Sequence, residues 1–270
     1  MGFVGKVLLF ASVAMGVACH AQTDASAVTA PVAVAPIVFE VTSVKVNKSG
    51  NSGSHSSFDN GRFIATNVSL KNLMQYSAYE VPEVRILGGP KWMDSARFDI
   101  EAKLDGPGTE RLRALGRHES RLQTLAMMQE LLADRFKLAV HWETRELPVY
   151  ALVAGKNGAR LEAAKKADKG TSIETGNNSM TADDVTMADL ARAMTQELSS
   201  ELGRVVVDKT GIAGKYDLAL KWTPVESSAS IDTGPSIFTA VQEQLGLKLE
   251  SAKAPVEVLV IDHVEMPQEN

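Results

Sequence analysis

Hydrophobic and polar residues alternate along two short segments of this chain, one in each half. In Phe98–Leu104 every second residue is apolar and the residues between are charged, and Tyr216–Trp222 has the same period of two. Because successive side chains of a strand point to opposite faces, both segments predict strands with one buried face. Further strands are predicted at Phe39–Val46, Gly61–Thr66, Leu138–Trp142, Leu147–Val153, Leu247–Leu249 and Val256–Ile261.

Three helices are predicted where a capping residue precedes apolar residues at helical spacing. A Ser or Thr side chain at such a position accepts a hydrogen bond from a free N–H of the first turn. Asp189, three residues after Thr186, completes a variant of the capping box, and Gly246 is placed to end the third helix. The three caps are Ser69, Thr186 and Ser236, and a fourth helix is predicted over Leu125–Phe136.

The second half of the chain repeats the pattern of the first. The segment Met180–Ala191 matches Phe63–Met74 in its strand, its cap and its helix face at a constant offset, with Asp184 in the place of Asn67. We therefore predict an α+β fold of two tandem pseudo-repeats. Each repeat has the order β-α-β-α-β-β, with a small mixed or antiparallel sheet packed by two helices.

The first residues have the parts of an export signal. A cation at Lys6 precedes the apolar run Val7–Ala18, and small residues follow. A bilayer-spanning helix needs about 20 apolar residues, so this run is too short to be one. We predict cleavage after Ala21 and an exported, periplasmic or extracellular protein. The alternative is a lipoprotein signal, in which Cys19 is acylated and anchors the chain to a membrane.

Composition divides the remainder of the chain. The stretch after Ala21 is rich in Ala, Val, Thr and Pro and predicts a flexible tether. Lys165–Asn178 is polar with Ile173 as its single apolar residue, which indicates a boundary. The predicted organisation is a signal peptide at 1–21, a tether at 22–36, a first repeat at 37–164, a linker at 165–178, a second repeat at 179–266 and a tail at 267–270.

Charge and cysteine usage exclude several classes of function. The net charge is −5 and no basic run is present, which argues against nucleic-acid binding. Cys19 is the only cysteine, so cleavage after Ala21 leaves no thiol for a disulfide, a nucleophile or a metal site. We expect no cofactor and no metal.

Several groups of residues suggest catalysis but have simpler structural interpretations. His55 lies among serines in Ser52–Ser57, yet no Gly-x-Ser-x-Gly elbow is present, so a polar loop is predicted. Asp208–Gly211 matches most of the phosphorylation signature of P-type ATPases, but Ile212 replaces the required threonine. A turn that uses Gly211 and Gly214 is predicted instead.

The histidines and the remaining acidic candidates also have structural interpretations. His118 lacks a second histidine four residues later, and His141 and His263 are predicted on solvent-facing positions of strands. Asp183 and Asp184 precede a helix, where acidic residues complement the helix dipole without a metal. The regular alternation around Trp142 and Trp222 predicts that both rings pack in the core.

Gly88, Gly89 and Trp92 are the candidate binding residues. Trp92 follows Gly88, Gly89 and Pro90 in a stretch rich in turn residues, beside Lys91 and Asp94. Since binding residues often lie on loops, a tryptophan there is a candidate recognition anchor. The alternative is that Trp92 packs back onto the core.

Four phrases of the sequence carry a family resemblance: Arg85–Lys103, Leu131–Leu138, Val207–Leu220 and Ser236–His263. They resemble the soil-associated protein family, which is abundant in acidobacterial genomes and is defined by a domain of unknown function. The likeness covers the chain from about Phe39 and implies an exported bacterial protein. In that family the domain stands alone or is appended to membrane metallopeptidases of the antibiotic-sensing type, and no catalytic residues are carried over. Each half also resembles the short N-terminal module of secretins and TonB-dependent receptors.

A duplicated scaffold without a concentration of reactive groups favours binding over catalysis. We expect a non-enzymatic, two-lobed binding protein of the bacterial envelope whose partner is a protein, a peptide or a cell-wall component. Exposed strand edges would allow the partner to bind by strand addition. One alternative is a sensory domain that works with a membrane metallopeptidase. The other is a secreted hydrolase whose site assembles only in the fold, from at least two of His55, His118, His141, Asp183 and Asp208.

Overall fold

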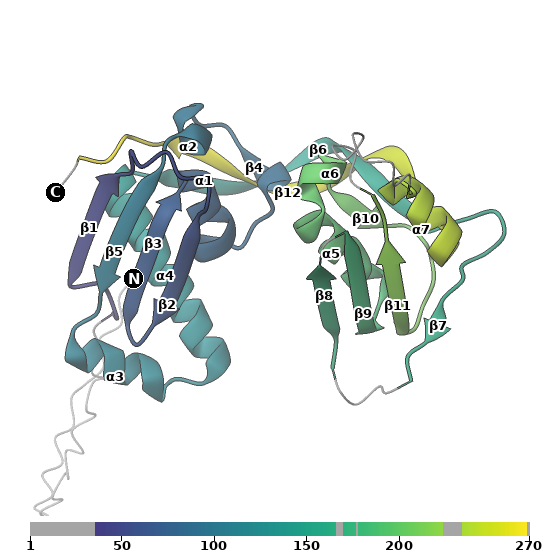
Figure 1. Cartoon of the computed structure of the whole chain (residues 1–270), viewed down its shortest axis with the longest axis horizontal. Coiled ribbons are helices and arrows are strands. Elements are labelled where there is room, and N and C mark those ends of the chain that lie inside the picture. Colours follow the sequence, from purple (N-terminus) through teal and green to yellow (C-terminus); the bar gives the residue numbers. More distant parts are fainter. Residues whose placement is uncertain (1–35, 166–169, 177, 224–233, 269–270) are drawn as a thin grey trace, which may run out of the picture. The chain divides into compact units, whose positions relative to one another are not determined.

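The computed structural model describes residues 36–165, 170–176, 178–223 and 234–268, so the predicted signal peptide and nearly all of the predicted tether lie outside the described residues. The fold is mixed α+β, as predicted, with three four-stranded sheets (Figure 1). The prediction of one sheet in each repeat missed the third sheet. That sheet is formed by strands from both halves of the chain.

The first sheet has the strand order β1-β5-β3-β2 and is antiparallel throughout. The edge strand β2 begins inside the segment predicted as a polar loop, and the difference arises because β2 is held by pairing with β3. The turn between them, Asn60–Gly61, has positive φ at both residues, as two-residue hairpin turns require. The strands are β1 (Val41–Val46), β2 (His55–Asp59), β3 (Arg62–Val68) and β5 (Phe98–Lys103).

Several helices of the first half pack on this sheet. The Ser69 side chain accepts a hydrogen bond from the N–H of Asn72 at 3.1 Å, which confirms the predicted cap. The capped helix continues as a π-helix, which its apolar spacing did not predict. The elements are α1 (Leu70–Leu73), the π-helix η1 (Met74–Ala78), the 3₁₀-helix η2 (Glu83–Arg85), α2 (Trp92–Ser95), α3 (Gly106–Ala114) and α4 (Arg117–Phe136).

The second half contains an antiparallel sheet with the corresponding strand order, β7-β11-β9-β8. Strand β8 lies inside Lys165–Asn178, which was predicted as a linker. Thr186 and Asp189 form the predicted capping box, each side chain accepting a hydrogen bond from the other residue's N–H at 3.1 Å. The elements are β7 (Glu162–Ala163), β8 (Ser172–Gly176), β9 (Ser179–Val185), α5 (Met187–Glu197), α6 (Ser199–Leu202), β11 (Tyr216–Lys221) and α7 (Ile237–Leu245).

The third sheet, β10-β6-β12-β4, joins the two halves. Its centre is a long antiparallel pair, and each of its two strands replaces two shorter strands of the prediction. Each short strand pairs with the long strand of the other half. Strand β4, from the first half, pairs with β12 from the second, and β10, from the second half, pairs with β6 from the first. The strands are β4 (Ile86–Leu87), β6 (Ala139–Ala154), β10 (Val206–Asp208) and β12 (Leu247–His263).

A buried bulge occurs at the same place in each half. Asn67 and Asp184 both adopt a left-handed backbone, with φ of 57° and 55°. The N–H of Asn67 donates to Oδ1 of Asp99 at 2.9 Å, and the N–H of Asp184 donates to Oδ1 of Asp217 at 3.0 Å. The halves therefore share strand order and this hydrogen bond, whereas their origin as a tandem repeat stays a prediction.

Two large hydrophobic cores hold the fold together. The first is built mainly from the first half but includes Leu259 and Ile261 of β12. The second is built from the second half and includes Leu152 of β6. The long strands β6 and β12 thus contribute to both cores, so neither half encloses its core with its own residues alone.

Candidate functional site

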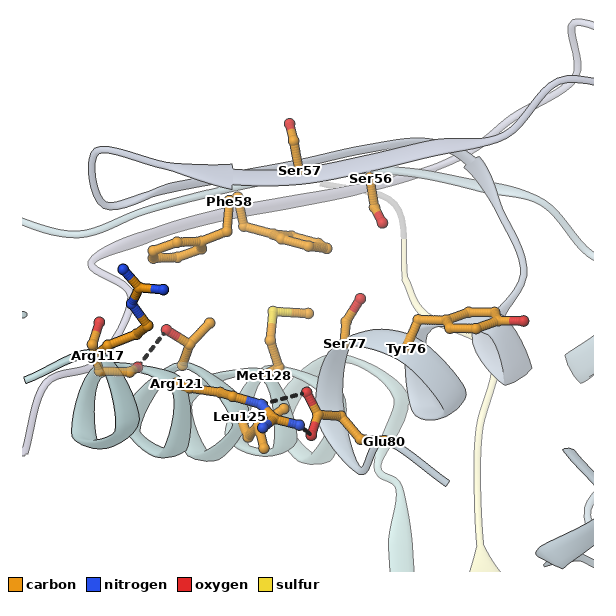
Figure 2. Close-up of a pocket in the computed structure, with 13 residues that line it drawn as sticks. Ser56, Ser57, Phe58, Tyr76, Ser77, Glu80, Arg117, Arg121, Leu125 and Met128 are labelled. Atoms are coloured by element: carbon orange, nitrogen blue, oxygen red, sulfur yellow. Dashed lines mark hydrogen bonds and ion pairs between the residues drawn. The ribbon is translucent and has the colours of Figure 1, made fainter. Parts of the chain in front are cut away.

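A groove of about 430 Å³ lies between the β2–β3 hairpin and helices η1 and α4 (Figure 2). Alternate residues of β2 face different ways: Ser56 and Phe58 point into the groove, and Ser57 points away from it. From α4, residues spaced three or four apart line the groove, which places them on one side of the helix. These are Arg117, Arg121, Leu125 and Met128.

The groove lies beside an open strand edge. Asp59 pairs with Arg62 across the two-residue turn, and Phe58 pairs with Phe63. The pair next to such a turn exchanges hydrogen bonds, and the pairs then alternate along the hairpin. The backbone N–H and C=O groups of Phe58 and Ser56 therefore point away from β3. Since β2 ends its sheet, no strand that the structure describes pairs with these groups, and another strand can pair with them.

The π-helix η1 forms one end of the groove. Its Tyr76 side chain is unusually exposed for an aromatic residue, at 60%, and its hydroxyl accepts a hydrogen bond from Nε2 of buried Gln75 at 3.0 Å. Partial burial raises the pKa of the Tyr76 phenol, and the charges of Glu197 and Glu83 raise it further. The phenol is therefore neutral at physiological pH and can donate a hydrogen bond. Single π-turns often occur at functional sites, and α5 in the second half has none.

Two arginines on α4 give the groove a positive side. Arg121 holds the carboxylate of Glu80 through two hydrogen bonds, from Nε to Oε1 at 3.0 Å and from Nη2 to Oε2. This interaction raises the pKa of the Arg121 guanidinium. Arg117, one turn earlier, extends toward Phe58 and forms no ion pair with any residue that the structure describes (Figure 2). The groove therefore combines an apolar floor, hydroxyl groups and one guanidinium available for a ligand.

The predicted binding residues lie elsewhere. Gly88 and Gly89 are exposed and adopt φ of 85° and 81°, and a side chain at Gly89 would collide with Sδ of Met93. Trp92 packs against the first core, with its ring edge-on to Phe98 at 6.4 Å between centroids. This environment matches the alternative interpretation of Trp92, in which its ring packs back onto the core. A role of Gly88, Gly89 and Trp92 in binding stays a prediction.

The five residues proposed for a hydrolase site do not line one common cavity among those that the structure describes. His55 lines a cavity of about 310 Å³, and Asp208 lines a different one of about 420 Å³. The Asp208 carboxylate accepts hydrogen bonds from Thr210, within the turn predicted there. His141 contacts Asp262 on the exposed surface of the long strand pair, and His118 and Asp183 are exposed on α4 and β9.

The two tryptophans that were predicted to lie in the core have different environments. Trp222 is buried in the second core, and its Nε1 donates to Glu201 at 2.9 Å. Trp142 was wrongly predicted to be in the core: it is 45% exposed, and the guanidinium of Arg85 lies 5.7 Å from its ring. Alternation identifies one face of a strand, but it does not tell whether another element covers that face.

The residues that the structure describes contain neither a cluster of metal ligands nor a helix able to cross a membrane. No group of three or more His, Cys, Asp or Glu side chains among them could hold a metal ion. Of the helices in the same residues, none combines the length and the apolar composition needed to cross a membrane.

Sequence reasoning missed the groove because it missed β2. A signal was present: Asn60–Gly61 is a strong hairpin dipeptide, and it follows a segment in which Ser56 and Phe58 share a face. The opposing residues come from η1 and α4, far along the chain, and only the fold brings them beside β2.

Comparison with known proteins places the chain in one family. Residues 47–264 match the profile of the family described as "Protein of unknown function (DUF3738)". Comparison with curated proteins and with solved structures finds no significant match.

Proposed function

The chain belongs to the DUF3738 family, and we propose that it is an exported binding protein of the bacterial envelope that takes an extended polypeptide segment into the groove beside β2. The observation that carries the proposal is the outer edge of β2, which pairs with no other strand that the structure describes and lies directly beside the groove. An added strand would pair with the outward backbone groups of Ser56 and Phe58. Main-chain hydrogen bonds would supply affinity, and side-chain contacts in the groove would supply specificity.

The groove lining suits the side chains of such a segment. Successive residues of an added strand would point alternately toward the helices and toward solvent. Those that point toward the helices would meet the apolar surfaces of Phe58, Leu125 and Met128. Near the other end, Ser56 and Ser77 offer hydroxyl groups, and the ring of Tyr76 lies beyond them with its hydroxyl directed away from the groove (Figure 2). An apolar side chain at the centre and polar groups at the ends fit this arrangement.

Features specific to the first half also support the proposal. The two halves share strand order and the buried bulge, so those features serve the scaffold. The π-helix η1 and the long N-terminal part of α4 occur in the first half, whereas α5 is regular and α7 has nine residues. The helical side of the groove is built from these additional elements, which is typical of a site placed on a common scaffold.

The cellular setting of the proposal comes from the sequence. The export signal with cleavage after Ala21, or acylation at Cys19, would place the groove outside the cytoplasm. The likeness to soil-associated proteins of acidobacteria implies an exported bacterial protein. The partner we propose is an envelope protein, a peptide or a peptide component of the cell wall. A sensory role beside a membrane metallopeptidase would use the same groove. A hydrolase is not proposed, because none of the cavities described above is lined by two of its candidate residues.

The test is selection of peptides from a phage-displayed random dodecapeptide library on the purified chain. Synthetic versions of the selected peptides are then measured by fluorescence polarisation against the Ser56→Pro variant. Because the N–H of Ser56 points away from β3, proline there leaves the hairpin bonds intact but removes a donor and obstructs an added strand. We expect affinity to fall about tenfold or more.

Thr175→Pro is the matched control. Thr175 lies on edge strand β8, one residue before the Gly176–Ser179 pair, so its N–H also points away from the neighbouring strand β9. In register it corresponds to Phe58 of β2. We expect it to leave peptide affinity unchanged, and circular dichroism should show that both variants are folded. Failure to select any peptide, or an equal loss of affinity in both variants, would contradict binding at β2.

A further inference from the structure

We infer that the groove selects acidic segments: a carboxylate of the bound strand contacts Arg117, on the same face of that strand as the apolar side chain that fills the groove. The inference rests on the proposed function and specifies its ligand. Two kinds of observation support the inference: the charges around the groove and the alternation of side chains along a strand.

The first observation is the local charge. The chain as a whole is acidic, with a net charge of −5, yet Gly106–Thr124 carries four arginines against two glutamates. Arg117 and Arg121 of this segment line the groove, and Glu80 is its only lining carboxylate. Since Arg121 is paired with Glu80, the groove retains one positive charge in excess, at Arg117.

The second observation is that the groove already binds a carboxylate. Arg121 contacts both oxygens of Glu80, the geometry in which a guanidinium recognises a carboxylate. Arg117 lies one turn away on the same face of α4, with its guanidinium toward the hairpin (Figure 2). A second carboxylate, supplied by a bound segment, would therefore find the same kind of partner without displacing Glu80.

The alternation of side chains along a strand also determines where the acidic residue must lie in the bound segment. Only alternate residues of a strand added to β2 face the helices. The acidic residue must therefore lie two or four positions from the apolar residue that packs against Phe58 and Leu125. A carboxylate moved by one position would point to solvent and lose Arg117. This spacing rule separates recognition by Arg117 from general attraction between unlike charges.

The test compares selections from the same dodecapeptide library on three proteins: the natural chain, Arg117→Gln and Arg97→Gln. Arg97 is exposed in the same half but does not line the groove, so Arg97→Gln removes the same charge elsewhere. On the natural chain and on Arg97→Gln, we expect enrichment of Asp or Glu at even spacing from an apolar residue. On Arg117→Gln this enrichment should disappear.

The affinities of matched sets of selected peptides are then measured by fluorescence polarisation. Replacing the peptide glutamate by glutamine should weaken binding to the natural chain about threefold to tenfold. The same replacement should have little effect on Arg117→Gln, which completes a double-mutant cycle. An isomeric peptide with the glutamate moved by one position should lose the same affinity as the glutamine peptide.

The outcomes distinguish the two proposals. Selected peptides without an acidic preference, or full affinity of the shifted isomer, would overturn the acidic ligand and leave strand addition standing. An acidic preference that survives Arg117→Gln would overturn the role of that residue. Failure to select any peptide would overturn the proposed function and this inference together.

Discussion

At the residue scale, short polar side chains determine where helices begin. Ser69, Thr186 and Ser236 each accept a hydrogen bond from an N–H of the following turn. Thr186 differs from the other two because its partner Asp189 is charged. The hydrogen bond from the Thr186 hydroxyl is the main cause that lowers the pKa of the Asp189 carboxyl, and the hydrogen bond from the Thr186 N–H lowers it further. Nearby Arg192 and Lys215 act in the same direction.

This cap predicts a pH-dependent contribution to stability. A carboxyl whose pKa is lowered by folding stabilises the native state above its unfolded pKa, near 3.9, and loses that contribution as the pH falls through the folded value. Thr186→Ala should lower the free energy of unfolding by about 1 kcal/mol at pH 7 and by less at pH 3. Urea unfolding at the two pH values measures the difference.

Ser236→Ala is the control, because the Ser236 cap involves no carboxylate. Its cost should be the same at both pH values. If the cost of Thr186→Ala were equally independent of pH, the Asp189 carboxylate would not contribute to the cap.

At the element scale, the bulge before each capped helix shows how a strand is made to end. Asn67 and Asp184 turn the chain through a left-handed conformation, which takes their N–H groups out of the strand ladder. Aspartates on the neighbouring strand accept these hydrogen bonds, Asp99 on β5 and Asp217 on β11. Each aspartate accepts a second hydrogen bond, from Asn47 and Lys165 respectively.

The same substitution should therefore have the same effect in both halves. Asp99→Ala and Asp217→Ala each leave a buried N–H without an acceptor, so each should lower the free energy of unfolding by about 1–3 kcal/mol. Glu101→Ala, also on β5 but in an exposed ion pair with Arg62, should cost about 0.5 kcal/mol or less. Chemical denaturation of the three variants measures this, and a large cost in one half only would argue against equivalent bulges.

At the scale of the whole molecule, the two cores are connected by the strands that they share. Strands β6 and β12 pair along nearly their whole length, and each supplies side chains to the core of the other half. The short strands β4 and β10 add to this connection. Unfolding of one core exposes part of the other, which favours a single cooperative transition.

This cooperativity can be tested with the three tryptophans of the chain. Trp142→Phe combined with Trp222→Phe leaves Trp92 to report on the first core, and Trp92→Phe with Trp142→Phe leaves Trp222 for the second. In each double variant, the fluorescence and circular dichroism transitions in urea should have the same midpoint. Separate midpoints would show that the cores unfold independently.

The sequence by itself determined the features that depend on local chemistry. The α+β class, the helix caps, the end of α7 at Gly246 and the inward faces of β5 and β11 follow from periodicity and capping. Each requires only residues within a few positions of one another. The side chains of Phe98, Ile100 and Leu220 are buried as their alternation indicates, because a strand shifted by one residue would expose them.

The tertiary structure decided the features that depend on pairing between distant segments. Strand β2 has one apolar residue, Phe58, and is ordered by hydrogen bonds to β3 rather than by its own pattern. The long strands β6 and β12 continue through polar stretches because each pairs with the other. The groove has residues from β2, η1 and α4, and Trp142 is exposed, because packing between elements is not encoded in the period of any single one.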